Sequence, residues 1–269
     1  MSFQEELNNY NELGYQYMNC FEKDSIIHKI NSLIDSLEPK VFIPYSENIP
    51  WGYGNLIDCE KLIKIINLKE IMNRVAKYLT KGNLVCNHLV IADKAAFIGP
   101  DVEWHQEFSN INSFAPGYNP NKDLRKFAQL YIAIDEHTSE NGTLFVFEGS
   151  HKEGLLPTED IINNHLNHKR RIKYNSIKKV SSKYKQKAVI LKPGQALLFN
   201  HLLVHGSPTN CSPFRRRAML LQFRIADKIK DEFLFNEEVE KRKQFVLNQL
   251  DIKKDKLLNS EIYKDLGKN

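Results

Sequence analysis

The stretch FAQLYIAIDEHTSENGTLFVFEG, residues 127–149, contains two runs typical of β-strands, and the turn-forming pair Asn141-Gly142 separates them. Both runs are short and rich in aromatic and branched aliphatic residues, which favours strands over helices. Further segments of this kind lie between residues 83 and 226, among them LVCNHLVIA, VEWHQEF, AVIL, QALLFNHLLVHG and RAMLLQFRIA. Seven or eight strands in one region predict a sandwich or a barrel.

Helices are expected on both sides of this β-rich region. Residues 21–40 place isoleucine and leucine at helical spacing, and Asp24 or Ser25 can cap the first turn. Residues 58–80 form a second amphipathic pattern with Asp58 as its cap. No internal repeat or linker is evident, so we expect a single domain over residues 1–269. Its expected parts are N-terminal helices over 22–80, a β core over 83–226 and a charged helical tail over 229–269.

The composition is that of an ordinary folded protein. The 269 residues are 42% hydrophobic and 26% charged, which excludes disorder, collagen and coiled coil as descriptions of the whole chain. The four cysteines lie far apart with no CxxC pair, so neither a zinc knuckle nor a redox motif is visible. The start of the chain is polar and no run is long and apolar enough for a membrane span, so we expect a cytoplasmic protein without a membrane partner.

A candidate metal site lies in the segment GPDVEWHQEFSN, residues 99–110. On a strand, residues i and i+2 point to the same side, so His105 and Glu107 would project together while Gln106 faces away. Such pairs often arise by chance, and two ligands do not complete a site. His205, at the end of a strand far downstream, can supply the third ligand of a 2-His-1-carboxylate triad for iron(II).

Further motifs accompany these three residues. In chain order they are His105-Gln106-Glu107, Asn141-Gly142, EGSH at 148–151, His205-Gly206-Ser207, Asn210 and Arg216. This series resembles the phytanoyl-CoA dioxygenase (PhyH) superfamily of iron(II)/2-oxoglutarate-dependent oxygenases, which includes ectoine hydroxylase. The similarity begins in NELGYQYMNCFEKDSIIHKI, residues 11–30, ends near Arg224, and so covers most of the chain except the tail.

The resemblance implies a mainly β fold with flanking α-helices, namely a double-stranded β-helix or jelly-roll. It implies that His105, Glu107 and His205 bind iron and act in catalysis, with 2-oxoglutarate and O2 as cosubstrates. Arg216 would bind the distal carboxylate of 2-oxoglutarate, which suits a guanidinium because its planar fork is permanently charged. Two further residues match positions beside the cosubstrate: Ser207 and Tyr131.

The implied reaction converts 2-oxoglutarate to succinate and CO2 and hydroxylates an unactivated C–H bond of a small molecule. Desaturation or ring closure stays open as the outcome. Iron binds neutral imidazole, so activity should fall in acid as the histidines become protonated. Arg215 and Arg217 are rivals for the carboxylate, but strand alternation turns both away if Arg216 faces the site.

Two positions depart from the family pattern. Glutamate stands at position 107 where aspartate is usual, which lengthens the ligand by one methylene. It is still a carboxylate, so iron binding should survive with altered geometry. A carboxylate here also argues against the related halogenases, which have a small residue at this position. Glu148 stands where proline usually precedes the glycine of EGSH, which we interpret as loop variation.

Other polar residues near these motifs have two interpretations. His88 and Lys94 lie on the strand and turn before the first ligand, where relatives place groups that contact cofactor or substrate; otherwise they fill ordinary structural roles. His201 is expected to pack beside the site rather than to bind metal, and His151 to stabilise a loop. Three histidines are expected at the surface: His137, His165 and His168.

The segment KRRIKYNSIKKVSSKYKQK, residues 169–187, holds nine basic residues and no acid. It predicts either a solvated insertion or a lid that draws in an anionic or carrier-linked substrate. A nucleic-acid interface is the least favoured alternative, because one basic loop with two tyrosines is common on surfaces. Two other functions stay open: a cupin-like metal-binding isomerase or binding protein, which has no use for Arg216, and a nucleic-acid-binding module.

Overall fold

The computed structural model describes residues 2–37, 41–42, 49–107, 124–161 and 170–226. The predicted helical tail, 229–269, and the predicted surface residues His165 and His168 lie outside these ranges. The chain divides into two compact units after Ile225, and the fold of the first is as follows. None of the helices within the described ranges is long and apolar enough to cross a membrane.

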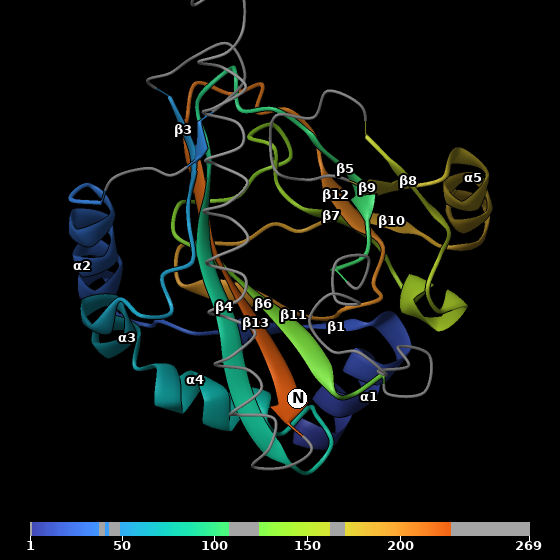
Figure 1. Ribbon diagram of the computed structural model, residues 1–269, viewed down its shortest axis with the longest axis horizontal. Helices are drawn as coiled ribbons and strands as arrows, with labels where there is room; N and C mark the ends of the chain where they lie inside the picture. Colours follow the sequence, from blue (N-terminus) through green and yellow to red (C-terminus); the bar gives the residue numbers. More distant parts are fainter. Residues whose placement is uncertain (1, 38–40, 43–48, 108–123, 162–169, 227–269) are drawn as a thin grey trace, which may run out of the picture. The chain divides into compact units, whose positions relative to one another are not determined.

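Two antiparallel β-sheets form the centre of the fold (Figure 1). The strands of the larger sheet are, in spatial order, β1 (Tyr15–Asn19), β11 (Gln195–Asn200), β6 (Phe127–Ala133), β13 (Arg216–Ala226), β4 (Asn83–Lys94), β3 (Pro50–Tyr53) and β2 (Val41–Phe42). Those of the smaller sheet are β10 (Gln186–Ala188), β7 (Phe145–Phe147), β12 (His205–Ser207) and β5 (Val102–His105). A separate hairpin packs beside β5 and consists of β8 (Thr158–Asp160) and β9 (Arg170–Ile172).

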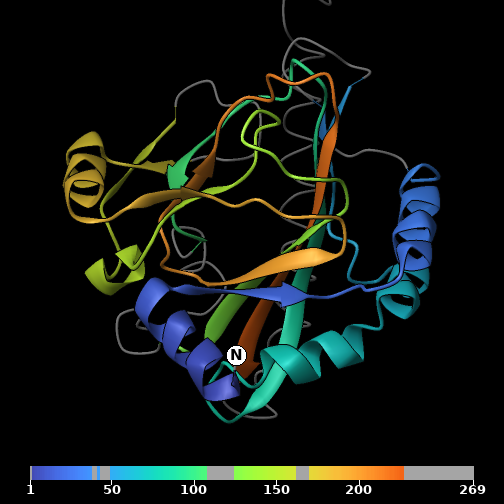
Figure 2. The same ribbon diagram turned by 180° about the vertical axis from the view of Figure 1, so that it is seen from behind.

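The two sheets face each other and enclose part of the core (Figure 2). One cluster of buried side chains joins them: Tyr131, Leu197, Phe199 and Ala218 from the larger sheet, and Val146 from the smaller. Two facing antiparallel sheets of this kind are the predicted double-stranded β-helix.

Helices cover the opposite side of the larger sheet (Figure 1). They are α2 (Asp24–Ile34), α3 (Glu60–Ile66) and α4 (Leu68–Val75), while α1 (Phe3–Leu13) precedes β1 and α5 (Tyr174–Lys183) lies outside the smaller sheet. Ile30, Leu62 and Val75 of these helices share one buried cluster with Leu130 and Leu221 of the sheet. Each such buried side chain contributes about 1.5–3 kcal/mol.

Alternation along the strands decides which residues can reach the space between the sheets. On β6, Leu130 and Ile132 pack toward the helices, whereas Tyr131 and Ala133 pack toward the smaller sheet. We call the side of the larger sheet that faces the smaller sheet the inner face. Every second residue of β6 and β13 therefore lies on the inner face.

Most predicted strands are found with shifted ends. The run QALLFNHLLVHG is instead two strands in different sheets, β11 and β12, and AVIL overlaps β10 only at Ala188. The helices also differ from expectation. The single helix predicted over 58–80 is α3 followed by α4, because Asn67 has a φ of 49° and interrupts it. Asparagine adopts this left-handed conformation more readily than most residues. The sequence pattern did not predict α1 or α5. A capping box of Ser2 and Glu5 begins α1, and this signal was readable in the sequence.

Candidate metal centre

His105, Glu107 and His205 come together at the edge of the smaller sheet. His105 ends β5, His205 begins β12, and the antiparallel register sets them opposite each other. Glu107 lies just beyond β5 rather than on the strand as expected. Its Oε1 is 3.8 Å from His105 Nε2 and 3.4 Å from His205 Nε2. The three ligand atoms lie within 4.8 Å of one another, close enough to share one metal ion.

Backbone carbonyls fix both imidazole rings. Nδ1 of His105 lies 2.7 Å from the carbonyl oxygen of Glu103, and Nδ1 of His205 lies 2.8 Å from that of Leu203. A carbonyl can only accept, so Nδ1 carries a proton in each ring, and Nε2 is the nitrogen left to bind a metal. Both Nε2 atoms approach the Glu107 carboxylate. This is the arrangement of metal-binding histidines whose second nitrogen is held by the protein.

The protonation states of the site suit a metal cation. Burial lowers the pKa of His105, and the neighbouring His205 lowers it further, so the His105 ring is neutral at pH 7. Burial raises the pKa of Glu107, but the two adjacent histidines outweigh burial and hold that pKa well below its usual value. An anionic carboxylate therefore lies beside a neutral imidazole, as metal binding requires.

Arg216 lies on the inner face at the start of β13. Its Nη1 donates to the Tyr131 hydroxyl at 2.6 Å, and its Nη2 donates to the Gly142 carbonyl at 2.7 Å. Its Nε is buried without a hydrogen-bond partner in the described part of the chain. The residue is only 2% exposed. A buried cation without a counter-ion is costly, so this position favours an anionic ligand.

The arginines on either side of Arg216 are neutralised within the protein. Arg215 forms a bidentate ion pair with Asp93, and Arg217 forms a bidentate ion pair with Asp135. Among the residues that the structure describes, Arg216 is thus the one of the three without a carboxylate partner. No sequence motif points to these two aspartates, which neutralise the arginines on either side of Arg216.

Lys94 ends β4 and is fully buried near Arg216. Its Nζ donates to the carbonyls of Ser207 and Pro208, and so it holds the loop that follows His205. Burial, and then the charge of Arg216, lower the pKa of Lys94 to about 6. The amine is therefore largely neutral at pH 7, and its predicted contact with a cosubstrate stays a prediction.

Three other site residues were predicted: Tyr131, Ser207 and His88. Tyr131 contacts Arg216 directly, through its hydroxyl. Ser207 is buried at the end of β12, two residues beyond His205. His88 is half-buried on β4 and is not part of the group of ligand atoms. Tyr131 and Ser207 thus lie next to residues of the site, and the contact of His88 with cosubstrate or substrate stays a prediction.

His137 was expected at the surface, and this prediction is wrong because the residue is fully buried. Its ring lies 5.3 Å from that of Tyr131, and its Nε2 lies 3.2 Å from the carbonyl oxygen of Arg217. A backbone bridge to Leu191 draws it inward, and such a distant pairing leaves no local sequence signal. Burial, and then the charge of Arg216, lower the pKa of His137 to about 3.

The remaining described histidines near the motifs have structural positions. His201 is fully buried and packs against Phe127, outside the group of ligand atoms. Burial lowers its pKa to about 3, so its ring is neutral. His151 Nε2 lies 3.0 Å from the carbonyl oxygen of Asn11, which ties its loop to α1. Both positions agree with the roles expected from the sequence.

Gln106 anchors the end of β5 between the two predicted ligands. Its side-chain nitrogen donates to the carbonyls of Gly154 and Leu202, and its oxygen accepts from the Leu156 amide. The residue is fully buried, so these bonds fix its position firmly. From the sequence, Gln106 was predicted to face away from the site and was given no role. Its polar side chain between two predicted ligands could have indicated that it is buried and hydrogen-bonded.

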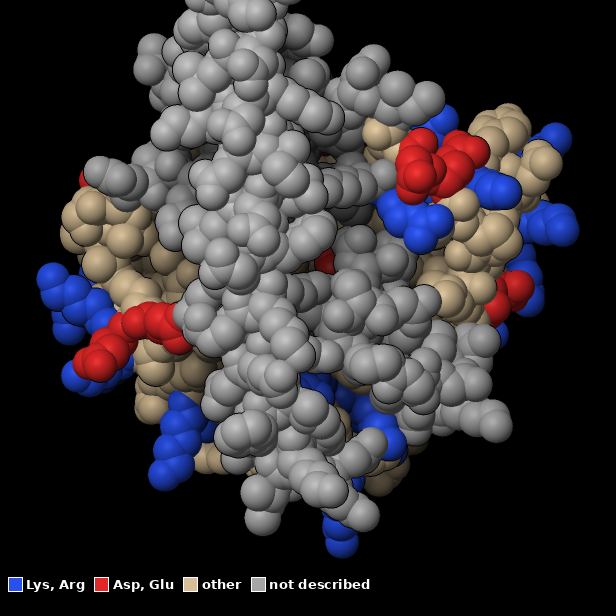
Figure 3. Space-filling model, in the orientation of Figure 1, with Lys and Arg blue, Asp and Glu red and all other residues tan. Residues whose placement is uncertain are grey.

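The basic segment forms part of β9, α5 and β10 rather than a bare loop. Val180 of α5 packs with Phe147 and Val204 on the outer side of the smaller sheet. Figure 3 shows acidic side chains among the basic ones on this side of the molecule. Of the eight basic residues that the structure describes in this segment, four form ion pairs: Arg170 with Asp160, Arg171 with Glu103 and Glu159, Lys183 with Glu153, and Lys187 with Glu148. These contacts support the interpretation as a solvated insertion.

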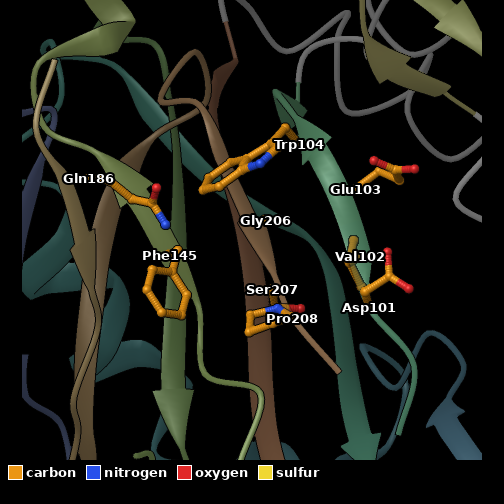
Figure 4. A pocket seen from close by; sticks show the side chains of 9 residues that line it. All are labelled: Asp101, Val102, Glu103, Trp104, Phe145, Gln186, Gly206, Ser207 and Pro208. Atoms are coloured by element: carbon orange, nitrogen blue, oxygen red, sulfur yellow. The ribbon is translucent and has the colours of Figure 1, made fainter. Parts of the chain in front are cut away.

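A pocket of about 230 Å³ lies against the same outer side of the smaller sheet (Figure 4). Trp104, Phe145 and Gly206 line it, together with Gln186 of β10. Trp104 precedes His105 on β5 and points to the opposite side of the strand. The pocket therefore lies behind the metal centre and contains none of its ligands.

Comparison with known proteins gives consistent matches. A family model for phytanoyl-CoA dioxygenase (PhyH) matches residues 58–218. The chain is 24% identical to the ectoine dioxygenase of Sphingopyxis alaskensis over 166 residues, which are 59% of this chain and 53% of that protein. The crystal structure of EctD from S. alaskensis with bound Fe gives a TM-score of 0.67 at 18% identity, and covers 84% of this chain and 77% of that one. The structure of EctD with 2-oxoglutarate and 5-hydroxyectoine gives 0.65 at 19% identity, and covers 84% and 76%.

The chain spans about half the length of the curated relatives that it matches. The structural likeness shows that the double-stranded β-helix fold is shared. The family match covers more than half of the chain and includes His105, Glu107, His205 and Arg216. The chain therefore belongs to the phytanoyl-CoA dioxygenase (PhyH) family.

Proposed function

We propose that this chain is an iron(II)/2-oxoglutarate-dependent dioxygenase that hydroxylates an unactivated C–H bond of a small molecule. One observation carries the proposal, namely a metal-binding triad on one sheet and, on the other, a buried cation without a carboxylate partner among the described residues. Two imidazole nitrogens and a carboxylate converge at the edge of the smaller sheet. Arg216, with no carboxylate partner among the described residues, lies on the inner face of the larger sheet. A metal with an anionic cosubstrate would use both features.

His105, Glu107 and His205 would hold the iron. Two imidazole nitrogens and one carboxylate match the donor set of non-haem iron(II) oxygenases, and three ligands leave positions open for cosubstrates. Glutamate in place of the family's aspartate reaches further by one methylene, which fits its position beyond the end of β5. The fit supports iron as the resident metal.

Arg216 would bind the distal carboxylate of 2-oxoglutarate through its unpartnered side. The Tyr131 hydroxyl and the Gly142 carbonyl already hold the guanidinium, so it needs no rearrangement to receive an anion. Ser207, two residues beyond His205 at the end of β12, would add a hydroxyl contact to the same carboxylate. We include His88 and Lys94 as further candidates for contacts with cosubstrate or substrate.

Iron with 2-oxoglutarate and O2 supplies the oxidising chemistry when bound, and succinate and CO2 are released. The protein itself would orient the metal ligands and exclude water from the site. The carbonyls of Glu103 and Leu203 keep the imidazole nitrogens aimed at the metal. Apolar side chains such as Leu197, Phe199 and Val146 pack between the sheets and would exclude water from the site.

The small molecule that is hydroxylated would enter between the two sheets. An anionic or carrier-linked substrate draws only limited support from the basic segment, because acids neutralise four of its basic residues. A cupin-like metal-binding protein without 2-oxoglutarate turnover is the second candidate. The triad alone would suit such a protein, but a buried Arg216 without a counter-ion would not.

The test is to incubate the purified protein with iron(II), 2-oxoglutarate and O2 and to measure succinate by mass spectrometry. We expect slow succinate formation without added substrate and faster formation with a metabolite extract. His105→Ala and Arg216→Ala should remove both signals, whereas Arg215→Ala should keep them. Iron binding without any succinate, even with the extract, would favour the cupin-like candidate.

A further inference from the structure

A row of amide side chains crosses the inner face, and the proposed chemistry uses none of them. Gln129 on β6 and Gln222 on β13 lie opposite each other in the antiparallel register. Asn87 on β4 donates from its side-chain nitrogen to Gln222 Oε1 at 3.1 Å. Asn87, Gln222 and Gln129, which we call the amide row, therefore cross three neighbouring strands.

Gln129 points toward the smaller sheet. Its neighbours Ala128 and Leu130 both belong to the cluster under the helices, whereas Tyr131 belongs to the cluster between the sheets. Side chains alternate along a strand, so Gln129 shares the inner face with Tyr131.

Gln129 is buried without a hydrogen bond. It is 0% exposed, yet neither its Nε2 nor its Oε1 has a partner within the described ranges. Asn87 Oδ1, at the other end of the amide row, is likewise unpartnered there. A buried polar group that is left unsatisfied destabilises the fold, and native proteins hold few of them. In Gln129 both polar atoms of the amide are unsatisfied, which points to a ligand as their partner.

The amide row lies at the level of the metal centre. Phe199 is the partner of Gln129 on β11, and the Phe199 ring lies 4.9 Å from the ring of His205. Tyr131, two residues further along β6, contacts Arg216 and so marks the side proposed for 2-oxoglutarate. A substrate held by Gln129 would thus lie near the metal without occupying the position of the cosubstrate.

We propose that Gln129, supported by Gln222 and Asn87, binds the substrate and positions it at the metal centre. This inference rests on the proposed function. The amide of Gln129 offers a donor group, its NH2, and an acceptor, its carbonyl oxygen, so it pairs best with an uncharged group that also offers both, such as a carboxamide or a hydroxyl. A carboxylate would satisfy Nε2 and leave Oε1 without a donor. The substrate class is therefore a small neutral polar molecule rather than an anion.

The first test measures stability without any ligand. Gln129→Met keeps the length of the side chain and removes the unsatisfied amide, so it should raise the Tm of the substrate-free protein. Gln186→Met, an exposed position on the outer side of the smaller sheet, is the matched control and should leave the Tm unchanged. A lower Tm for Gln129→Met would mean that the amide has a structural role, and would overturn the proposal.

The second test uses isobutyramide and isobutyrate, which share a shape and differ in one group. Binding is read from the broadening of their methyl proton NMR signals by protein loaded with iron(II) and 2-oxoglutarate without oxygen. We expect isobutyramide to broaden several-fold more than isobutyrate, and Gln129→Met to weaken isobutyramide binding about tenfold, which matches the loss of one hydrogen-bonded contact. Gln129→Asn, which withdraws the amide by one methylene, should give the same loss if the methionine variant does not fold.

Equal broadening of the two probes, or unchanged isobutyramide binding in both Gln129 variants, would overturn the amide row as a substrate site. Failure of the proposed function looks different. In that case wild-type protein binds iron but shows no visible absorption band on addition of 2-oxoglutarate. Isobutyramide broadening can then still be compared between iron-loaded wild type and the Gln129 variants. This comparison tests binding to Gln129 whether or not 2-oxoglutarate binds.

Discussion

At the residue scale, the metal centre depends on contacts that its ligands make on the side away from the metal. His105 and His205 each donate a hydrogen bond from Nδ1 to a backbone carbonyl two residues earlier, which aims Nε2 at Glu107. Gln106, buried between two ligands, is satisfied on both sides of its amide. A ligand held in this way loses little conformational freedom when the metal binds.

Replacing Arg216 by alanine should separate cosubstrate binding from metal binding. Loss of a charge-assisted contact costs about 1.5–3 kcal/mol, so the Kd of 2-oxoglutarate should rise by roughly 10-fold to 100-fold or more. The Kd of iron(II) should change little, because Arg216 is not in the group of ligand atoms. Anaerobic calorimetric titration measures both constants.

Arg215→Ala is the matched control for this change. It removes a neighbouring guanidinium whose charge Asp93 already neutralises. We expect lower stability and unchanged affinity for 2-oxoglutarate. If Arg215→Ala weakens 2-oxoglutarate as much as Arg216→Ala does, the carboxylate is not held by Arg216.

Lys94 should make stability rise with pH. Its pKa is about 6 in the folded protein, well below its value of roughly 10.4 in an unfolded chain. Between these values the unfolded state binds the extra proton, so unfolding free energy should increase by up to about 1.4 kcal/mol per pH unit. Urea denaturation at pH 7, 8 and 9 measures the slope.

Lys94→Met should flatten this slope, because no proton is then taken up at that position on unfolding. An identical slope in wild type and Lys94→Met would mean that Lys94 is protonated when folded. The measurement uses metal-free protein, so that ligand binding does not contribute.

At the element scale, the approach of β5 to β12 sets the distance between the two histidines. A Cβ on Gly206 would meet the Val102 carbonyl oxygen at 2.9 Å and the Trp104 ring at 3.3 Å. Glycine is therefore required here for the strands to approach, which gives a physical reason for the glycine of His205-Gly206-Ser207. The ring centroids of His105 and His205 are 4.0 Å apart as a result.

Gly206→Ala should push β5 away from β12 and weaken iron binding. Overpacking of this kind costs about 1–3 kcal/mol, and we expect the Kd of iron(II) to rise about tenfold. Circular dichroism of the metal-free variant checks that it folds. An unchanged iron Kd in a folded Gly206→Ala protein would contradict the link between strand spacing and the metal site.

Elements could be predicted from the sequence where the signal is local. The short apolar runs predicted strands such as β6, β11 and β13 because branched and aromatic residues favour them. The break at Asn67 was not predicted, since it requires a backbone conformation that the apolar stripe of residues 58–80 does not reveal. α5 was missed because basic residues hide its narrow apolar stripe, which ends on Val180.

At the scale of the whole molecule, the two sheets contribute different parts of the proposed site. The smaller sheet carries His105 and His205, and the larger carries Arg216 and Tyr131 on its inner face. A cosubstrate that binds both the metal and Arg216 would connect the two sheets. The connection has a thermodynamic consequence, since a ligand bound only by the folded state stabilises it.

Iron(II) and 2-oxoglutarate together should raise the Tm by more than the sum of their separate effects. Iron alone should stabilise through the triad, and 2-oxoglutarate alone should have little effect without its metal. Calorimetric scans under anaerobic conditions measure the four states. In Arg216→Ala the combination should equal iron alone, and a fully additive wild type would contradict a cosubstrate that joins the sheets.

The candidate site could be predicted from the sequence only in part. The positions of His105, Glu107, His205 and Arg216 came from a resemblance between motifs, because local patterns cannot show which distant strands become neighbours. The partners that complete the site were not predictable. Backbone carbonyls have no sequence signature, and Gln106, Asp93 and Asp135 find their partners through non-local packing.

The most direct test of the central claim is an anaerobic titration of the iron(II)-loaded protein with 2-oxoglutarate, followed by visible absorption. A metal chelated by the cosubstrate should give a weak charge-transfer band in the wild type. The band should be absent in His105→Ala, Glu107→Ala and His205→Ala. Iron binding without this band in the wild type would contradict the assignment of 2-oxoglutarate as the cosubstrate.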